Sequence, residues 1–199
     1  MDQQQLADLA AHIRASTDPA VVSALANGQD NELARLYNLP AADVQAWSRT
    51  ASVNAILDAI DSTKYTPVAT ITGTEVEPLL TRKRGWVDEI NVKLMVLQVM
   101  LMGRASVDAT RATVRGSLRD SVTQIPSGAL DGNGKPGSSA AGGASGATVL
   151  AACLRAVNVA EDALKSGSAT TGTTTGVLLT FEGNVASNDI SDALRPLQG

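Results

Sequence analysis

Few residues of this chain have the types and spacing that catalysis or phosphate binding requires. The segment 128–137, GALDGNGKPG, combines glycines with Lys135, as phosphate-binding loops do, because glycine leaves backbone N–H groups free to contact phosphate. However, Pro136 follows the lysine where such loops carry Ser or Thr, and no strand is predicted before it. Asp131 and Asn133 resemble the start of a calcium loop, but the remaining oxygen ligands are missing. We therefore interpret this segment as a flexible polar arm.

The residues that could act as nucleophile, acid or base are equally sparse. His12 is the only histidine, and no Gly-x-Ser-x-Gly turn accompanies it. The single cysteine, Cys153, falls in an apolar helical pattern, so we predict a buried structural thiol. Carboxylate pairs such as Glu161 and Asp162 are typical of solvated helix faces. We expect no enzyme, no cofactor and no metal site.

Basic residues form two clusters that deserve a functional hypothesis. The first comprises Arg104, Arg111, Arg115 and Arg119, and the second comprises Arg82, Lys83 and Arg84. The first cluster spans an arc of about eighty degrees on one predicted helix, beside its apolar stripe. A solvated flank that forms ion pairs with Asp108 or with a neighbouring helix would explain it. The alternative is that one cluster faces an acidic partner or passing DNA.

Length and composition predict one helical body. A chain of 199 residues suffices for one ordinary domain. The hydrophobic fraction is 44%, but aromatic residues make up only 3%, so we expect a thin core that depends on neighbouring subunits. The net charge of −4 makes the whole chain a poor match for a polyanion. The N-terminus lacks a signal pattern, and the most apolar window, 90–102, is too short to span a bilayer, so we expect no membrane partner.

Apolar residues at helical spacing predict a mostly α fold, a helical bundle with long Gly/Ser/Thr-rich loops and a small β element near the C-terminus. A further small β element near residues 66–72 is also compatible with the sequence. We divide the chain into a helical body, 1–165, with an extended loop at 127–146, and an arm, 166–199, made of a flexible linker, a short strand and a C-terminal helix. The expected helices end near residue 15 and then cover about 18–26, 33–37, 41–61, 74–102, 105–123, 147–165 and 187–195.

Two of these elements suggest assembly. The helix over 74–102 opens with the capping-box spacing of Thr74 and Glu77, and its second half is apolar nearly all round. Such a helix is buried on most sides, by its own domain or by other copies. On the arm, the short apolar strand could add to the edge of a neighbour's sheet. Its assembly candidates are Val177, Leu179 and Phe181.

The segments 101–104, 118–120, 125–128 and 180–183, together with the Gly/Ala-rich loop, resemble structural proteins of tailed bacteriophages. The resemblance is to helical head-to-tail adaptor proteins. It implies a homo-oligomeric ring of about twelve copies in the virion neck, made in the host cytoplasm. The implied partners are other copies of the chain, the portal protein, the tail or next neck protein, and passing DNA. The alternative is another phage morphogenetic protein, such as a tail-completion, decoration or assembly factor, with an unrecognised enzyme third.

Overall fold

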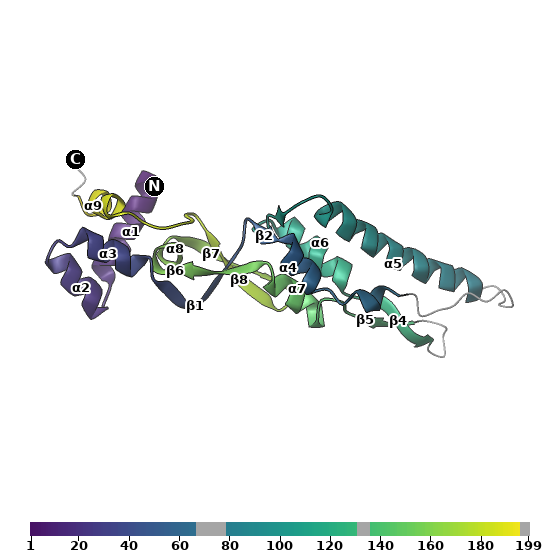
Figure 1. Ribbon diagram of the computed structural model, residues 1–199. Coiled ribbons are helices and arrows are strands. Elements are labelled where there is room, and N and C mark those ends of the chain that lie inside the picture. The colour runs from purple at the N-terminus through teal and green to yellow at the C-terminus, as the bar shows by residue number, and fades with distance from the viewer. Residues whose placement is uncertain (67–78, 131–135, 196–199) are drawn as a thin grey trace. The chain divides into compact units, whose positions relative to one another are not determined.

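The computed structural model describes residues 1–66, 79–130 and 136–195 (Figure 1). The predicted helical bundle is wrong, because the structure is a mixed α/β fold that contains a curled four-stranded sheet. The chain forms two compact units. The first comprises Met1–Ala46, Arg155–Ala169 and Gly176–Gly199, and the second comprises Trp47–Leu154 and Thr170–Thr175.

The first unit packs helices from both ends of the chain around one apolar cluster. Its helices are α1 (Gln3–Ala15), α2 (Pro19–Ala26), α3 (Asp30–Tyr37), α8 (Val159–Ala163) and α9 (Ser187–Leu194). Leu9, Leu33 and Ile190 are fully buried in this cluster. The predicted start of α2 is confirmed, since the Asp18 side chain accepts a hydrogen bond from Ala20 N at 2.8 Å and Pro19 is the first helical residue.

The four-stranded sheet lies mainly in this unit. Its strands are β1 (Pro40–Trp47), β6 (Leu154–Asn158), β7 (Lys165–Thr171) and β8 (Thr174–Leu179), in the order β6-β1-β8-β7. β1 and β8 are parallel, and Ala46 is paired with Val177. Segments that are distant in sequence therefore build the centre of the sheet.

The second unit surrounds two helices with short elements. It contains α4 (Val53–Asp58), α5 (Leu79–Leu101), α6 (Ala112–Val122) and α7 (Ala147–Ala151), with 3-10 turns at Ser62–Tyr65 and Ala144–Gly146. Two antiparallel pairs join β2 (Ala51–Ser52) to β3 (Ser106–Val107) and β4 (Ile125–Leu130) to β5 (Pro136–Ser139). α5 packs against α6 and β4, and α6 packs against α7. The Tyr65 hydroxyl donates a hydrogen bond to the Ser121 carbonyl at 2.9 Å and so connects the 3-10 turn at Ser62–Tyr65 to α6.

Three predicted elements are corrected. The helix expected over 41–61 is replaced by β1, β2 and α4, and the one over 147–165 by α7, β6 and α8. The helix over 105–123 begins only at Ala112. In each case strand pairing with a distant segment competes with the local helical pattern and prevails.

The two expected flexible segments are corrected as well. The loop over 127–146 contains most of the β4–β5 pair, although 131–135 lies outside the described residues. The linker of the expected arm forms two strands joined by a turn, since β7 covers Lys165–Thr171, β8 covers Thr174–Leu179, and the two are neighbours in the sheet. Gly172, at φ +60°, lies between them in the left-handed conformation that glycine tolerates. Thr74, Glu77 and nearly all of the possible β element at 66–72 lie outside the described residues.

Candidate interaction surface

The structure does not place the four arginines of the first cluster on one helix face. Arg104 follows α5, and Arg111 is the residue immediately before α6, so only Arg115 and Arg119 lie on that helix. Arg111 is exposed and lies 3.3 Å from the Asp108 carboxylate, while Arg119 lies 2.7 Å from that of Asp120. The Arg111 ion pair is the one with Asp108 that the simpler interpretation of the cluster predicts, whereas Arg119 pairs with the next residue of its own helix.

Arg115 is the exception, because its side chain is buried in the second unit. The residue is 3% exposed. It donates hydrogen bonds to the carbonyls of Ala109 and Thr110, at 2.8 and 2.6 Å, and to the Thr171 hydroxyl at 3.1 Å. Its guanidinium also lies 4.8 Å from the centre of the Trp47 ring. Arg115 therefore holds the fold together and offers no surface to DNA or to an acidic partner.

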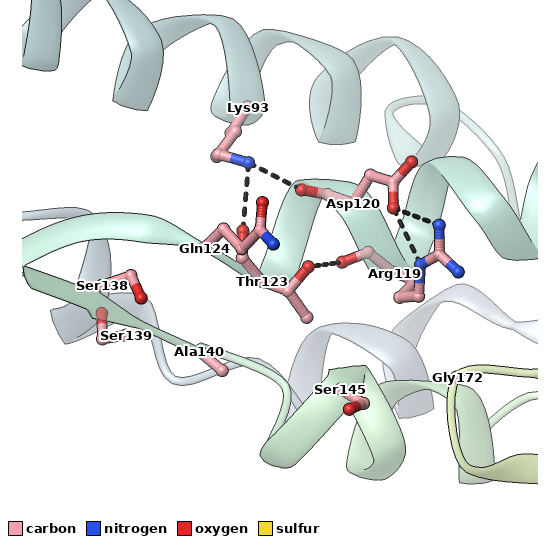
Figure 2. A pocket seen from close by; sticks show the side chains of 10 residues that line it. All are labelled: Lys93, Arg119, Asp120, Thr123, Gln124, Ser138, Ser139, Ala140, Ser145 and Gly172. Atoms are coloured by element: carbon pink, nitrogen blue, oxygen red, sulfur yellow. Dashed lines mark hydrogen bonds and ion pairs between the residues drawn. The ribbon is translucent and has the colours of Figure 1, made fainter.

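Arg119 also lines a cleft of about 670 Å³ between the end of α6 and β5 (Figure 2). Lys93 reaches into this cleft from α5 and donates to the carbonyls of Asp120 and Thr123, at 2.8 and 3.0 Å. These are carbonyls of the last turn of α6, where a cation is favourable. Both cations of the cleft thus serve groups of the protein.

The most unusual surface of the second unit is the outer face of α5. Val92, Met95, Val99 and Met102 are 53%, 56%, 71% and 69% exposed, whereas Leu97 on the opposite side of the helix is 7% exposed. The sequence predicts a helix that is buried on most sides, but within the second unit α5 is buried mainly on the side of Leu97. We call Val92, Met95 and Val99 of α5, together with Met102 just after the end of the helix, the outer stripe.

Met102, at one end of the outer stripe, also lines an apolar groove between α4 and the end of α5. The groove has a volume of about 570 Å³, and Met102 belongs to both surfaces. Leu57 and Leu94 also line it, and they are 50% and 37% exposed. A monomeric protein exposes single apolar residues routinely, but a contiguous apolar patch is typical of an interaction site. The helix and groove are therefore the candidate interaction surface.

The remaining predicted site residues lie elsewhere. On the N-terminal part of α5, Arg82 and Arg84 are exposed and Lys83 is half-buried. Val177 and Leu179 belong to β8 inside the sheet, and Phe181 packs against the core of the first unit. The structure thus places these three in the folded body of the first unit, and their role in assembly stays a prediction.

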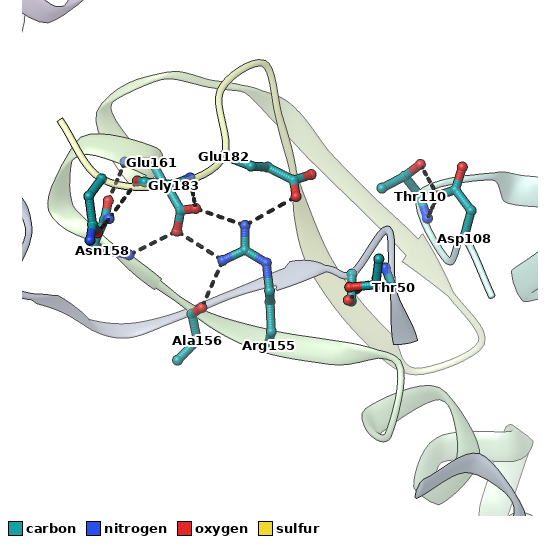
Figure 3. A network of polar contacts seen from close by, with 11 residues as sticks. Thr50, Asp108, Thr110, Arg155, Ala156, Asn158, Glu161, Glu182 and Gly183 are labelled. Carbon is teal, nitrogen blue, oxygen red and sulfur yellow. Dashed lines mark hydrogen bonds and ion pairs between the residues drawn. The ribbon is translucent and has the colours of Figure 1, made fainter. Parts of the chain in front are cut away.

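Sequence reasoning missed a buried carboxylate in the first unit. Glu161 accepts hydrogen bonds from both Nη atoms of Arg155, at 2.9 and 2.8 Å, and from the backbone N–H groups of Asn158 and Gly183 (Figure 3). Burial alone would raise the Glu161 pKa, but these hydrogen bonds and the Arg155 charge outweigh it and hold the pKa below its usual value. The spacing of Asn158 and Glu161, which matches a capping box, was the signal that could have revealed it.

The two residues considered for nucleophilic chemistry have structural surroundings. A hydrogen bond of 2.8 Å joins His12 Nδ1 to the Tyr37 hydroxyl, with the rings edge to face. Burial raises the pKa of Tyr37 to about 12. Cys153 is buried, as predicted, and burial raises the pKa of its thiol to about 11. His12 is thus hydrogen-bonded to a tyrosine, and the Cys153 thiol donates to the Val149 carbonyl at 3.4 Å, which gives both residues a structural role.

Within the described residues, no group of three His, Cys, Asp or Glu side chains could hold a metal ion. Across the same residues, no helix combines the length and apolar character needed to cross a membrane. Comparison with protein families, curated proteins and solved structures finds no match to the chain.

Proposed function

We propose that this protein is a structural component of a tailed-phage virion, a head-to-tail adaptor that forms a homo-oligomeric ring between portal and tail. The observation that carries the proposal is the exposed outer stripe of α5, because apolar surface of this kind is stabilised when a partner removes it from water. The resemblance of segments such as 101–104 and 180–183 to phage structural proteins supports the choice of assembly.

The test is quantitative mass spectrometry of purified particles of a phage that encodes the protein, with heads and tails separated. We expect the protein in the head-and-neck fraction, at about one copy per portal subunit if neck rings match their portal. Its absence from particles would refute the adaptor and favour an assembly factor. An abundance equal to that of the capsid shell would refute it in favour of decoration.

Contact with DNA or with an acidic partner is tested on the arginines that remain exposed. The double variant Arg111→Glu/Arg119→Glu reverses the charges of exposed Arg111 and half-buried Arg119 without changing buried Arg115. Arg35→Glu on α3 is the control, because Arg35 is exposed and forms a comparable ion pair with Glu32. Loss of assembly or DNA retention in the double variant alone would support a partner-facing role. Unchanged assembly and DNA retention would instead support the interpretation of these arginines as a solvated flank of the helix.

A further inference from the structure

We propose that a groove lined by α5, the end of α6 and β5 binds a neutral carbohydrate. The cleft shown in Figure 2 adjoins a second hollow of about 570 Å³, and Gln124 and Ser138 line both of them. We call the cleft and this hollow together the polar groove. Both lie within the second unit. The inference goes beyond the adaptor role and does not depend on it.

One face of α5 borders the polar groove. Trp86 and Glu89 line the hollow, and Lys93 lines the cleft. These residues are three and seven positions apart, a spacing that places them on one side of the helix. Trp86 is partly exposed there, whereas the other tryptophan, Trp47, is 1% exposed. The Trp86 indole therefore offers a flat apolar surface, against which the C–H face of a pyranose ring can pack.

The other side of the polar groove supplies hydrogen-bonding groups. Its hydroxyl and amide groups come from Thr123, Gln124, Ser138, Ser139 and Ser145. Small-molecule sites are usually lined mainly by apolar side chains, so this lining favours a ligand that is itself polar over most of its surface. A hydroxyl group both donates and accepts hydrogen bonds. The many hydroxyl groups of a carbohydrate can therefore pair with every group of this set.

The charges of the polar groove favour a neutral ligand. Among the described residues, its charged side chains are two cations and two carboxylates, namely Lys93, Arg119, Glu89 and Asp120. Their formal charges cancel. Lys93 already donates to two carbonyls, and Arg119 is paired with Asp120. An anionic ligand would have to displace these contacts, because a desolvated charge without a partner is costly. A neutral sugar leaves them in place.

Two features indicate that the cleft is completed by a ligand. Ser139 Oγ is buried and has no hydrogen-bond partner among the described residues, and such a group lowers stability unless a bound group satisfies it. Gln124 and Ser145 have φ values of +52° and +54°, and Asp43 is the other non-glycine residue with positive φ in the described part of the chain. Strained backbone of this kind is concentrated at ligand-binding sites.

The first experiment titrates the full-length chain with neutral saccharides, by isothermal calorimetry and saturation-transfer NMR. The probes are glucose, galactose, mannose and N-acetylglucosamine, each with the linear trisaccharide of the same unit, and a blocked Ser-Gly tetrapeptide as the polar probe that is not a carbohydrate. We expect at least one series to bind, with the trisaccharide at least about tenfold tighter than the monosaccharide, because it can contact both the hollow and the cleft. Salt should not change this affinity, since no charge is paired.

Three results would overturn the proposal. The first is that no saccharide binds, or that the tetrapeptide binds and the saccharides do not. The second is equal affinity of mono- and trisaccharide in every series that binds. The third is an affinity that falls steeply between about 0.05 M and about 0.5 M NaCl, because charge would then dominate recognition.

The second experiment locates the ligand with two variants. Trp86→Ala should weaken binding of the tightest saccharide at least about tenfold, because it removes the stacking surface. Gln124→Gly should weaken it about threefold or more. This variant removes the amide at a position where glycine adopts the observed φ without strain, so the fold is retained.

Asp43→Gly is the matched control for Gln124→Gly. It makes the same change of backbone at an exposed residue of β1, in the first unit, whose φ is +58°. The control should bind the saccharide like the wild type. Wild-type affinity in both Trp86→Ala and Gln124→Gly would place the ligand elsewhere and overturn the assignment to the polar groove.

Discussion

Replacing Arg115 by methionine should destabilise the second unit strongly. Methionine keeps much of the apolar length of the side chain but has no donor. The carbonyls of Ala109 and Thr110 and the hydroxyl of Thr171 would then lose their guanidinium partner, and the contact with Trp47 would lose its charge.

The magnitude follows from these contacts. Hydrogen bonds to a charged group contribute about 1.5–3 kcal/mol each to stability, and a desolvated cation–π contact about 2 kcal/mol. Removal of Arg115 also removes the cost of burying a cation with no carboxylate among its hydrogen-bond partners, which offsets several kcal/mol of that loss. We therefore expect the free energy of unfolding to fall by about 3 kcal/mol.

The assay is unfolding in urea, monitored by the fluorescence of Trp47. Every variant also carries Trp86→Phe, so that Trp47 is the fluorescent tryptophan that reports unfolding. The control is Arg111→Met, because the Arg111 side chain is 72% exposed and has a single ion pair, with Asp108 at 3.3 Å. Exposed ion pairs contribute about 0–1 kcal/mol, so the control should unfold almost like the parent. A loss for Arg115→Met no larger than that of the control would refute the structural role.

Three further predictions concern single groups. Because the Glu161 pKa is held below its usual value, its carboxylate stabilises the fold above about pH 4.3 and loses that effect as pH falls through the folded-state pKa. In Glu161→Gln, the free energy of unfolding should therefore depend less on pH in this range, and a pH dependence identical to that of the wild type would refute the network. Iodoacetamide should label Cys153 at pH 8 at least about a hundredfold more slowly in the native protein than in urea, since its thiol is buried with a pKa of about 11; equal rates would contradict this. Gly142→Ala should lower the free energy of unfolding by about 1–3 kcal/mol, because a Cβ there would lie 2.7 Å from Val149 Cγ2. The control is Gly116→Ala on α6, where a Cβ would have nothing within 4 Å; in thermal melts its unfolding temperature should rise or change little.

Sequence predicted the elements whose signals are local. The apolar spacing of Leu9 and Ile13, the cap at Asp18 and the last helix all appear as expected in α1, α2 and α9. Each of these depends on contacts within a few residues, namely a capping hydrogen bond or a helical apolar face. The same holds for α5, whose described part ends one residue before the predicted Met102.

The sheet could not be predicted in this way, because its pairing is distant. β1 lies next to β8, and Ala46 and Val177 are paired across more than half of the chain. Val44 and Trp47 are also three residues apart, a spacing that places them on one face of a helix but on opposite faces of a strand, so the local pattern favours the helix. The Gly and Ser content of the Thr-rich segment that forms β7 favours a flexible linker, although β-branched threonine also favours strands.

The candidate surface shows the same limit for side chains. Residue type predicts arginine outside and valine inside, yet Arg115 is buried and Val99 is 71% exposed. Helical position does not distinguish them, because Arg115 borders the apolar stripe of α6 and Val99 belongs to the half of α5 that is apolar nearly all round. A buried arginine is tolerated when carbonyls and an aromatic ring satisfy it, which Ala109 and Trp47 help to do. Among the described residues of the second unit, nothing comparable compensates for the exposure of Val99 and its apolar neighbours on α5, because apolar side chains gain only when other apolar surface removes them from water.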